Sequence, residues 1–345
     1  MIDNTTDALI YLDHNVLDKI TKEQLDTIFK RLSPSKITPV YSDENLQEIA
    51  KAKGYENKLL SRLKAIGAVY LRLENVNSRY TGKAAFIDID PFEAYSQYMG
   101  NKMGMPDLGY GLTDMLHKFY GGLSDKTYSE VLTLGISELL EELDNSAAEL
   151  QYDENLSRAH RILAQEAVAQ VRNVLPKMYE HMGKTLDGNT AKSTIIEQVD
   201  KSLAGGPKNL NNIKAPNVVR QIWDLLKTRF PDKALTLDMF FGLTPDLYGP
   251  ADKRELSLVE KVNALYHQLN FLGYHRDAKM QDRNRFNASF SDRTHAGCAV
   301  FCHYIMSMDK RLIMKTAAAY ERLDVFTKTV HLKLSRNVQG TKGRQ

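Results

Sequence analysis

Four acidic residues stand where predicted strands end or predicted helices lie, which is the placement that a catalytic metal site requires. Asp13 and Asp309 each end a predicted strand. Glu48 lies in the helix that follows the second predicted strand, and Asp292 opens a later helix. Because ligands of open parallel sheets bind at the carboxyl ends of the strands, we expect these four carboxylates to gather at one rim.

Several carboxylates at one rim repel each other unless a cation lies between them. Oxygen ligands favour hard cations, so the sequence predicts Mg²⁺ or Mn²⁺ rather than zinc, for which no Cys/His set is present. A divalent ion that carboxylates hold, with coordination positions left open, activates water for phosphodiester cleavage. Asp13, Glu48, Asp292 and Asp309 are therefore the candidate catalytic and metal-binding residues.

Neighbouring polar residues are candidates for binding a substrate or for orienting the carboxylates. These are Asn15, Arg293, His295, Ser307, Lys310 and Arg311. Lys and Arg would contact phosphates, and histidine can ligate a metal, transfer a proton or make a structural hydrogen bond. Each residue also has a purely structural interpretation: the acids as caps or ion-pair partners, and the bases as solvated surface.

The elements that must position these residues alternate between strand and helix. Strands are predicted at 8–12, 37–41, 304–308 and 325–332, and helices at 16–32, 42–54, 256–272, 291–300 and 310–323. In the helix at 291–300, Ser291 is the expected N-cap. This alternation predicts an α/β fold with a parallel sheet flanked by helices.

The middle of the chain has a different pattern. Helical periodicity dominates at 126–143, 155–182, 193–203 and 217–230, with loops between. We therefore expect residues 1–54 and 255–332 to form one α/β domain that a mainly helical insertion, 55–254, splits, followed by a basic tail at 333–345. A compact domain tolerates such an insertion when its entry and exit are close together. The glycine-rich segment 100–111 lacks the Gly-Lys-Ser/Thr ending of a phosphate-binding loop.

The motifs, in their order along the chain, resemble those of PIN-like nuclease domains. They are Leu12-Asp13-His14-Asn15-Val16, Ser42 with Leu46 and Glu48-Ile49, Asp292-Arg293-Thr294-His295-Ala296, and Ser307-Met308-Asp309-Lys310-Arg311-Leu312. The resemblance covers about 1–54 and 255–332. It implies a PIN-like, Rossmann-like fold and a metal-dependent endonuclease, most often acting on RNA, in which the four acids bind metal. It also implies a role as a toxin or in defence against phages.

Composition excludes some classes and leaves others open. The chain is 43% hydrophobic and 26% charged, which is typical of a folded globular protein. No apolar stretch of about 18 residues and no signal peptide is visible, so we expect a cytoplasmic protein without a membrane partner. Cys298 and Cys302 are expected to be free thiols. The formal charge is +3, but residues 325–345 carry +5, which leaves −2 on residues 1–324.

Three functions are compatible with the sequence. The first is a metal-dependent nuclease whose partner is nucleic acid, RNA rather than DNA. The second is a non-catalytic PIN-like scaffold in which the helical insertion binds a protein partner or a second copy of the chain. The third is a metal-dependent phosphatase that acts on small molecules.

Overall fold

The computed structural model describes residues 7–33, 36–76, 79–102, 110–152, 157–190, 194–203, 206–230, 234–244 and 255–333. The chain divides into two compact units. The first comprises 1–100, 208–276 and 291–345, and the second comprises 101–207 and 277–290. The basic tail beyond residue 333 and most of the glycine-rich segment 100–111 lie outside the described residues.

A six-stranded mixed sheet organises the first unit, in the order β4-β3-β2-β1-β5-β6. The strands are β1 (Ala8–Leu12), β2 (Ile37–Ser42), β3 (Val69–Val76), β4 (Arg79–Ile87), β5 (Tyr304–Ser307) and β6 (Lys328–His331). Neighbouring strands run parallel except for β4, which is antiparallel to β3. The α/β class is thus confirmed, whereas the expectation of a wholly parallel sheet was wrong.

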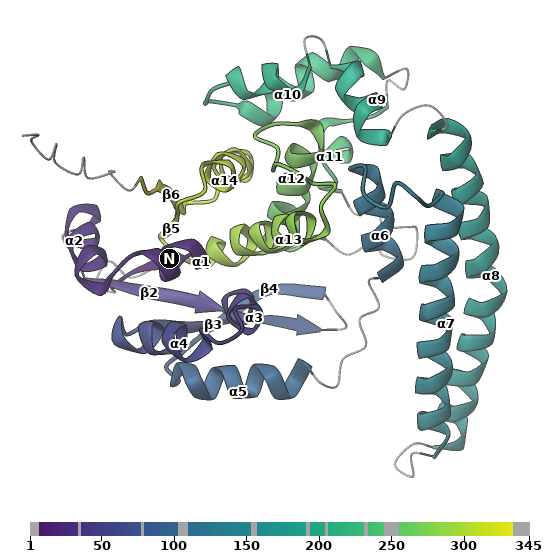
Figure 1. Ribbon diagram of the computed structural model, residues 1–345, viewed down its shortest axis with the longest axis horizontal. Helices are drawn as coiled ribbons and strands as arrows, with labels where there is room; N and C mark the ends of the chain where they lie inside the picture. Colours follow the sequence, from purple (N-terminus) through teal and green to yellow (C-terminus); the bar gives the residue numbers. More distant parts are fainter. Residues whose placement is uncertain are drawn as a thin grey trace, which may run out of the picture. The chain divides into compact units, whose positions relative to one another are not determined.

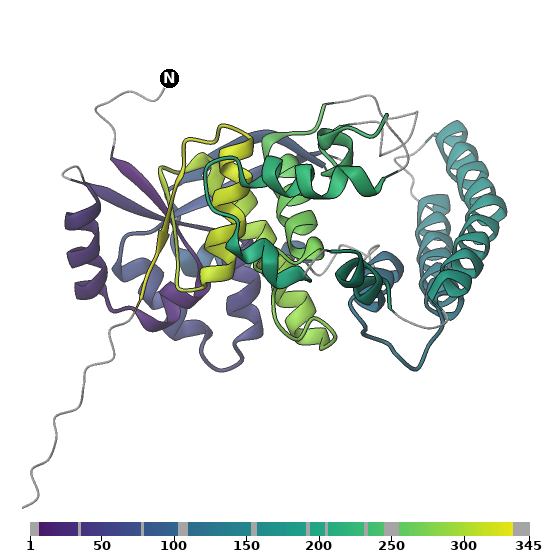
Figure 2. The ribbon, with the colours of Figure 1, turned by 90° about the horizontal axis from the view of Figure 1, so that it is seen from above.

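Helices cover both faces of this sheet (Figures 1 and 2). The unit holds, wholly or in part, α1 (His14–Lys19), α2 (Lys22–Leu32), α3 (Asp43–Lys51), α4 (Glu56–Ala65), α5 (Pro91–Lys102), α10 (Val218–Leu226), α11 (Leu237–Phe240), α12 (Leu258–Leu272), α13 (Arg283–Cys298) and α14 (Lys310–Arg322). Of these, α10 packs against α14. The helix α13 begins in the second unit and enters the first at Ser291. Figure 1 shows α4 and α5 on one side of the strands and α14 on the other.

Successive side chains along the strands pack into hydrophobic cores on the two faces of the sheet. Tyr11 points to the face that α12, α13 and α14 cover, and it packs with Val40 and Leu71. Its neighbours Ile10 and Leu12 point to the other face. Because successive side chains of a strand point in opposite directions, this alternation is what a sheet buried on both faces requires.

Two segments differ from the sequence-based prediction. The helix expected at 16–32 is two helices, because the Thr21 hydroxyl and the Gln24 side chain form a capping box that starts α2 anew. The hairpin of β3 and β4 lies inside the segment expected to be a helical insertion from residue 55. It pairs with β2, and the sheet-bearing unit extends to Gly100.

The second unit is helical among its described residues. It holds α6 (Tyr110–Phe119), α7 (Tyr128–Tyr152), α8 (Arg158–Thr190), α9 (Ile195–Ser202) and the first part of α13. The helices α7 and α8 approach closely at Gly183, where an added Cβ would lie 2.8 Å from the Cα of Ser129. The helical periodicity of the middle is therefore confirmed for these segments. Among the described helices, none is both long and apolar enough to cross a membrane.

Candidate metal centre at the carboxyl ends of the central strands

Asp13 follows β1 directly and lies where β1 and β5 end side by side. Its backbone N–H donates to the carbonyl of Met306 in β5, at 3.1 Å. The Ser307 hydroxyl donates to Asp13 Oδ2 at 2.5 Å, and Asn15 Nδ2 donates to the same oxygen. From β1 and β5 the chain continues toward opposite edges of the sheet. Asp13 therefore occupies the topological switch point, where open α/β sheets bind ligands.

Two glutamates on α3 face this point. Glu44 and Glu48 are one helical turn apart, and the buried Asn45 side chain donates to the Leu12 carbonyl at 2.9 Å. That bond fixes the first turn of α3 against the end of β1. Ser291 on α13 places its hydroxyl 2.6 Å from Glu44 Oε1 and 2.9 Å from Glu48 Oε1. The hydroxyl thus holds both carboxylates on the same side of α3.

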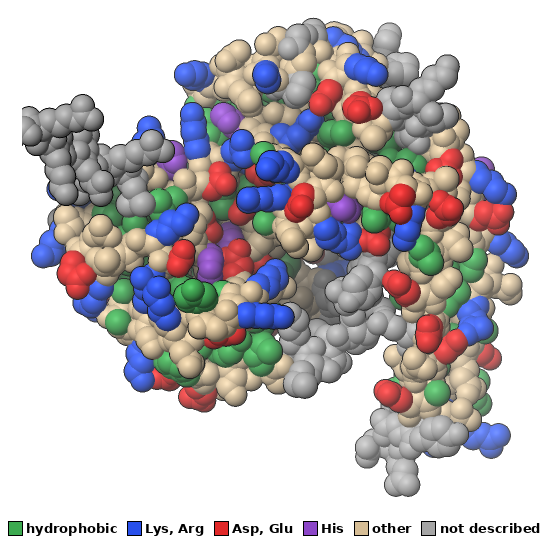
Figure 3. Space-filling view, in the orientation of Figure 1, with side chains coloured by type: hydrophobic (Ala, Val, Ile, Leu, Met, Phe, Trp, Pro, Cys, Tyr) green, Lys and Arg blue, Asp and Glu red, His purple; other side chains and the backbone are tan. Residues whose placement is uncertain are grey.

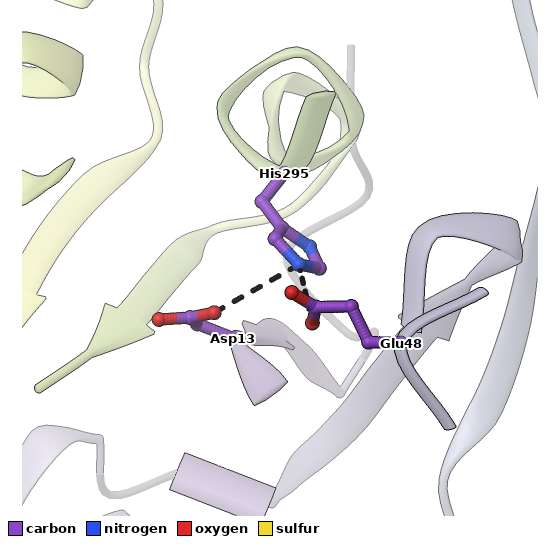
Figure 4. A group of neighbouring side chains, drawn as sticks. All are labelled: Asp13, Glu48 and His295. Atoms are coloured by element: carbon purple, nitrogen blue, oxygen red, sulfur yellow. Dashed lines mark hydrogen bonds and ion pairs between the residues drawn. The ribbon is translucent and has the colours of Figure 1, made fainter. Parts of the chain in front are cut away.

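His295 completes the group from α13 (Figure 4). Its side chain is fully buried, and its Nε2 lies 3.0 Å from Glu48 Oε2 and 3.8 Å from Asp13 Oδ1. Its Nδ1 lies 2.8 Å from the Tyr11 hydroxyl. When Nδ1–H donates to Tyr11, Nε2 is presented to the carboxylates, which is how histidine metal ligands are oriented.

The charges in this group are strongly coupled. Burial lowers the pKa of His295, but Glu48, Asp13 and Glu44 outweigh it and raise that pKa to about 10. Burial raises the pKa of Glu48, but the neighbouring His295 outweighs it and lowers that pKa to about 2. For Asp13 and Glu44 burial prevails, so their pKa values are raised. In the absence of metal, one imidazolium therefore faces three carboxyl groups.

These residues fit a divalent cation. Asp13, Glu48 and His295 each offer one ligand atom, and the three atoms lie within 4.8 Å of one another. His14 Nδ1 is inaccessible to solvent, has no hydrogen-bond partner within the described part of the chain, and lies 3.7 Å from Glu48 Oε2. A buried nitrogen without a partner beside carboxylates is a position that a cation would satisfy.

The structure brings together Asp13 and Glu48, two of the four predicted acids, whereas Asp309 and Asp292 lie outside the three-residue group. Asp309 caps α14, because its Oδ1 accepts hydrogen bonds from the backbone of Arg311 at 2.6 Å and of Leu312 at 3.3 Å. Its own N–H donates to the Ser307 hydroxyl at 2.9 Å, which links it to Asp13. Asp292 lies partly buried on α13 and is not a member of the three-residue group.

The predicted substrate-binding residues fall into two sets. Asn15 and Ser307 contact Asp13 directly, and His295 belongs to the group itself. The others, Lys310, Arg311 and Arg293, make no contribution to the three-residue group. Lys310 and Arg311 are exposed at the start of α14, whereas Arg293 is partly buried on α13.

Sequence reasoning missed part of the environment of this group. Ser291 was expected to be an N-cap, but α13 begins eight residues earlier, at Arg283, so Ser291 is free to bridge two glutamates. Glu44 was not among the predicted site residues, although α3 turns it toward Ser291. Tyr11 lies between apolar residues in β1, so the sequence indicated a core position. Its hydroxyl, which lies 2.8 Å from His295 Nδ1, was the one feature that could have suggested a role in orienting His295.

No known protein family, curated protein or solved structure matches this chain. The resemblance to PIN-like nucleases accordingly stays a prediction from motifs, and the geometry of the group is the basis for a functional proposal.

The stability of the metal-free protein is expected to fall as the pH rises from about 7 to about 10. The folded protein holds a proton on His295, whose pKa is about 10, whereas a histidine in the unfolded chain has a pKa of about 6.5. This stabilisation is complete below the unfolded value and is lost as the pH rises through the folded one. Urea denaturation in EDTA at pH 7, 8.5 and 9.5 measures it. The variant His295→Gln should show a much smaller slope, and equal slopes would contradict the assignment.

Proposed function

We propose that this chain is a metal-dependent nuclease that hydrolyses phosphodiester bonds, with RNA as a better substrate than DNA. The observation that carries the proposal is the convergence of Asp13, Glu48 and His295 from β1, α3 and α13 at the switch point of the sheet. Three ligands of this kind leave coordination positions for substrate and water. When bound, a divalent cation supplies Lewis-acid activation of the phosphoryl group and of water.

The ligand set favours Mn²⁺ over Mg²⁺. The metal ligands predicted from the sequence were four carboxylates, whereas the group in the structure offers the imidazole of His295, and His14 Nδ1 lies 3.7 Å from Glu48 Oε2. Imidazole ligands favour transition metals, whereas Mg²⁺ is usually held by carboxylates, phosphates and water. Metal binding at Nε2 also requires loss of the His295 proton, so the affinity for metal should rise with pH.

The residues in and around the metal-binding group have defined tasks in this proposal. Asp13 and Glu48 supply negative charge at fixed positions, because Ser307 and Ser291 hold their carboxylates by hydrogen bonds. Figure 3 shows Lys and Arg side chains around a surface patch of Asp, Glu and His side chains. The exposed Lys310 at the start of α14 is one candidate to bind the phosphates of the substrate.

A non-catalytic scaffold is the second candidate, and one observation favours it. Protonated His295 already places a positive charge between Glu48 and Asp13, with Nε2 at 3.0 Å and 3.8 Å from their oxygens. The imidazolium thus neutralises part of the carboxylate charge without any metal. In a scaffold the same three residues would serve only to join β1, α3 and α13.

A cleavage assay separates the candidates. End-labelled single-stranded RNA and DNA are incubated with the protein and Mn²⁺, Mg²⁺ or EDTA. We expect internal cleavage of RNA that is faster with Mn²⁺ than with Mg²⁺ and absent in EDTA. Absence of cleavage with every ion would refute the nuclease and support the scaffold. Release of phosphate from a small phosphomonoester, without internal cleavage, would support the small-molecule phosphatase instead.

A further inference from the structure

A pocket of about 170 Å³ opens beside the metal-binding group, within the first unit. Its walls come from the end of β2 and from α3, β3, β4, α5 and α13. It forms because β2 ends at Ser42, opposite Leu71, whereas β3 continues to Val76. The part of β3 beyond Leu71 thus lacks a neighbour on the β2 side, and Leu73 and Asn75 form the floor there.

The size and lining of this pocket suit a flat ring system. Drug-sized ligands need roughly 300–1,000 Å³, whereas a cavity of roughly 150 Å³ accommodates one benzene ring. Tyr80 and Tyr98 contribute two aromatic rings, and Gln47, Asn75 and Thr294 contribute amide and hydroxyl groups. Proteins that bind single-stranded RNA stack bases on aromatic rings and bind base edges with such polar groups.

Two carboxyl groups, of Asp43 and Glu44, line the pocket, and Asp43 Oδ1 accepts the Tyr70 hydroxyl at 2.6 Å. The carboxylate of Glu44 narrows the choice of base. Glu44 lines the pocket, and its Oε1 accepts the Ser291 hydroxyl at 2.6 Å. Burial raises the pKa of Glu44, because it disfavours the charged form of the carboxyl group. Guanine alone presents two adjacent N–H donors on its Watson–Crick edge, which one carboxylate can accept together. In adenine and cytosine a donor adjoins an acceptor, and in uracil two acceptors flank one donor.

The pocket and the metal-binding group share a helix. Glu44 and Glu48 are four residues apart on α3, about 5–6 Å along the axis, and Ser291 contacts both. A base held at Glu44 therefore places its own or the neighbouring phosphate near Glu48 and His295. We propose that this pocket binds one guanine base of a single-stranded RNA and so selects the bond that is cut. The inference rests on the proposed function, because it assigns the adjoining phosphate to the metal-binding group.

Binding without metal tests the pocket. The full-length protein in EDTA is titrated into fluorescein-labelled oligouridine octamers that carry one central guanine, one central adenine or neither. We expect the guanine octamer to bind about tenfold more tightly than the adenine octamer, measured by fluorescence anisotropy. Guanosine 5′-monophosphate should compete more weakly than the octamer. Equal affinity of the free nucleotide would overturn binding within a strand, and equal affinity of the octamers would overturn the pocket.

Two matched variants locate the preference. Glu44→Gln replaces one acceptor by a donor and should abolish the difference between guanine and adenine. Glu74→Gln makes the same change on β3, at an exposed residue whose carboxylate contacts Thr81 and does not line the pocket. The Glu74→Gln protein should keep the preference for guanine over adenine. Loss of the preference in this variant would refute the assignment of guanine binding to the pocket at Glu44. If Glu44→Gln does not fold, the octamer comparison on the unmodified protein decides alone.

The outcomes for the pocket and for the nuclease can be told apart. Cleavage of RNA without any preference for guanine in binding would refute the pocket and leave the nuclease standing. A guanine preference in a protein that cleaves nothing would refute the nuclease and its link to this pocket, leaving guanine recognition alone supported.

Discussion

Replacing Asp13 by Asn is expected to lower the rate of Mn²⁺-dependent RNA cleavage about a thousandfold while leaving the fold intact. The amide has the same shape, and its oxygen can still accept from Ser307 and Asn15. What it loses is a negative charge at the switch point of the sheet. Since burial raises the pKa of Asp13, removing that charge costs little stability. Rates come from gel analysis of an end-labelled RNA, and folding from circular dichroism.

The matched control for this change is Asp18→Asn. Asp18 is exposed on α1, five residues from Asp13, so the same substitution there should leave the cleavage rate within about twofold of the unmodified protein. A folded Asp13→Asn protein that cleaves at the normal rate would contradict the proposed centre. Equal losses in both variants would indicate a general effect on the preparation rather than the loss of a ligand.

Much of the site's framework could be predicted from the sequence, because it follows from local pattern. Asp13 ends an apolar strand, and Glu48 lies in a helix whose start is capped directly after the next strand. Because these two strands are parallel, both residues lie at the carboxyl ends of the strands. The role of His295 could not be derived in this way. Its contact with Glu48 joins residues 247 positions apart, and it depends on how α13 is rotated against α3.

The differences between the predicted and the observed fold have equally specific causes. The prediction of one helix at 16–32 rested on apolar spacing alone, whereas Thr21 and Gln24 form a local capping box that starts a second helix. The hairpin of β3 and β4 had a weaker signal. Its strands have one largely exposed face and β4 lies at the edge, so their residues lack the continuous apolar run of a buried strand.

Replacing His295 by Ala is expected to lower the free energy of unfolding by about 3 kcal/mol in EDTA, and Mn²⁺ should restore part of it. The imidazolium is fully buried between Glu48 and Asp13, so its removal leaves carboxylates without a cation. A divalent ion can take over that charge from the remaining ligands, because proton and metal are alternative cations for the same oxygens. Urea denaturation with EDTA and with a series of Mn²⁺ concentrations measures both effects.

The recovery by Mn²⁺ is what separates a metal centre from a scaffold. Any destabilised variant would lose stability, but only a variant with a retained cation site gains it back through binding to the folded state. His181→Ala, at an exposed position on α8, controls for the substitution and should change stability by less than about 0.5 kcal/mol with or without metal. If Mn²⁺ leaves both the unmodified protein and His295→Ala unchanged, Asp13 and Glu48 bind no ion. The three residues then serve to join β1, α3 and α13 by an internal ion pair.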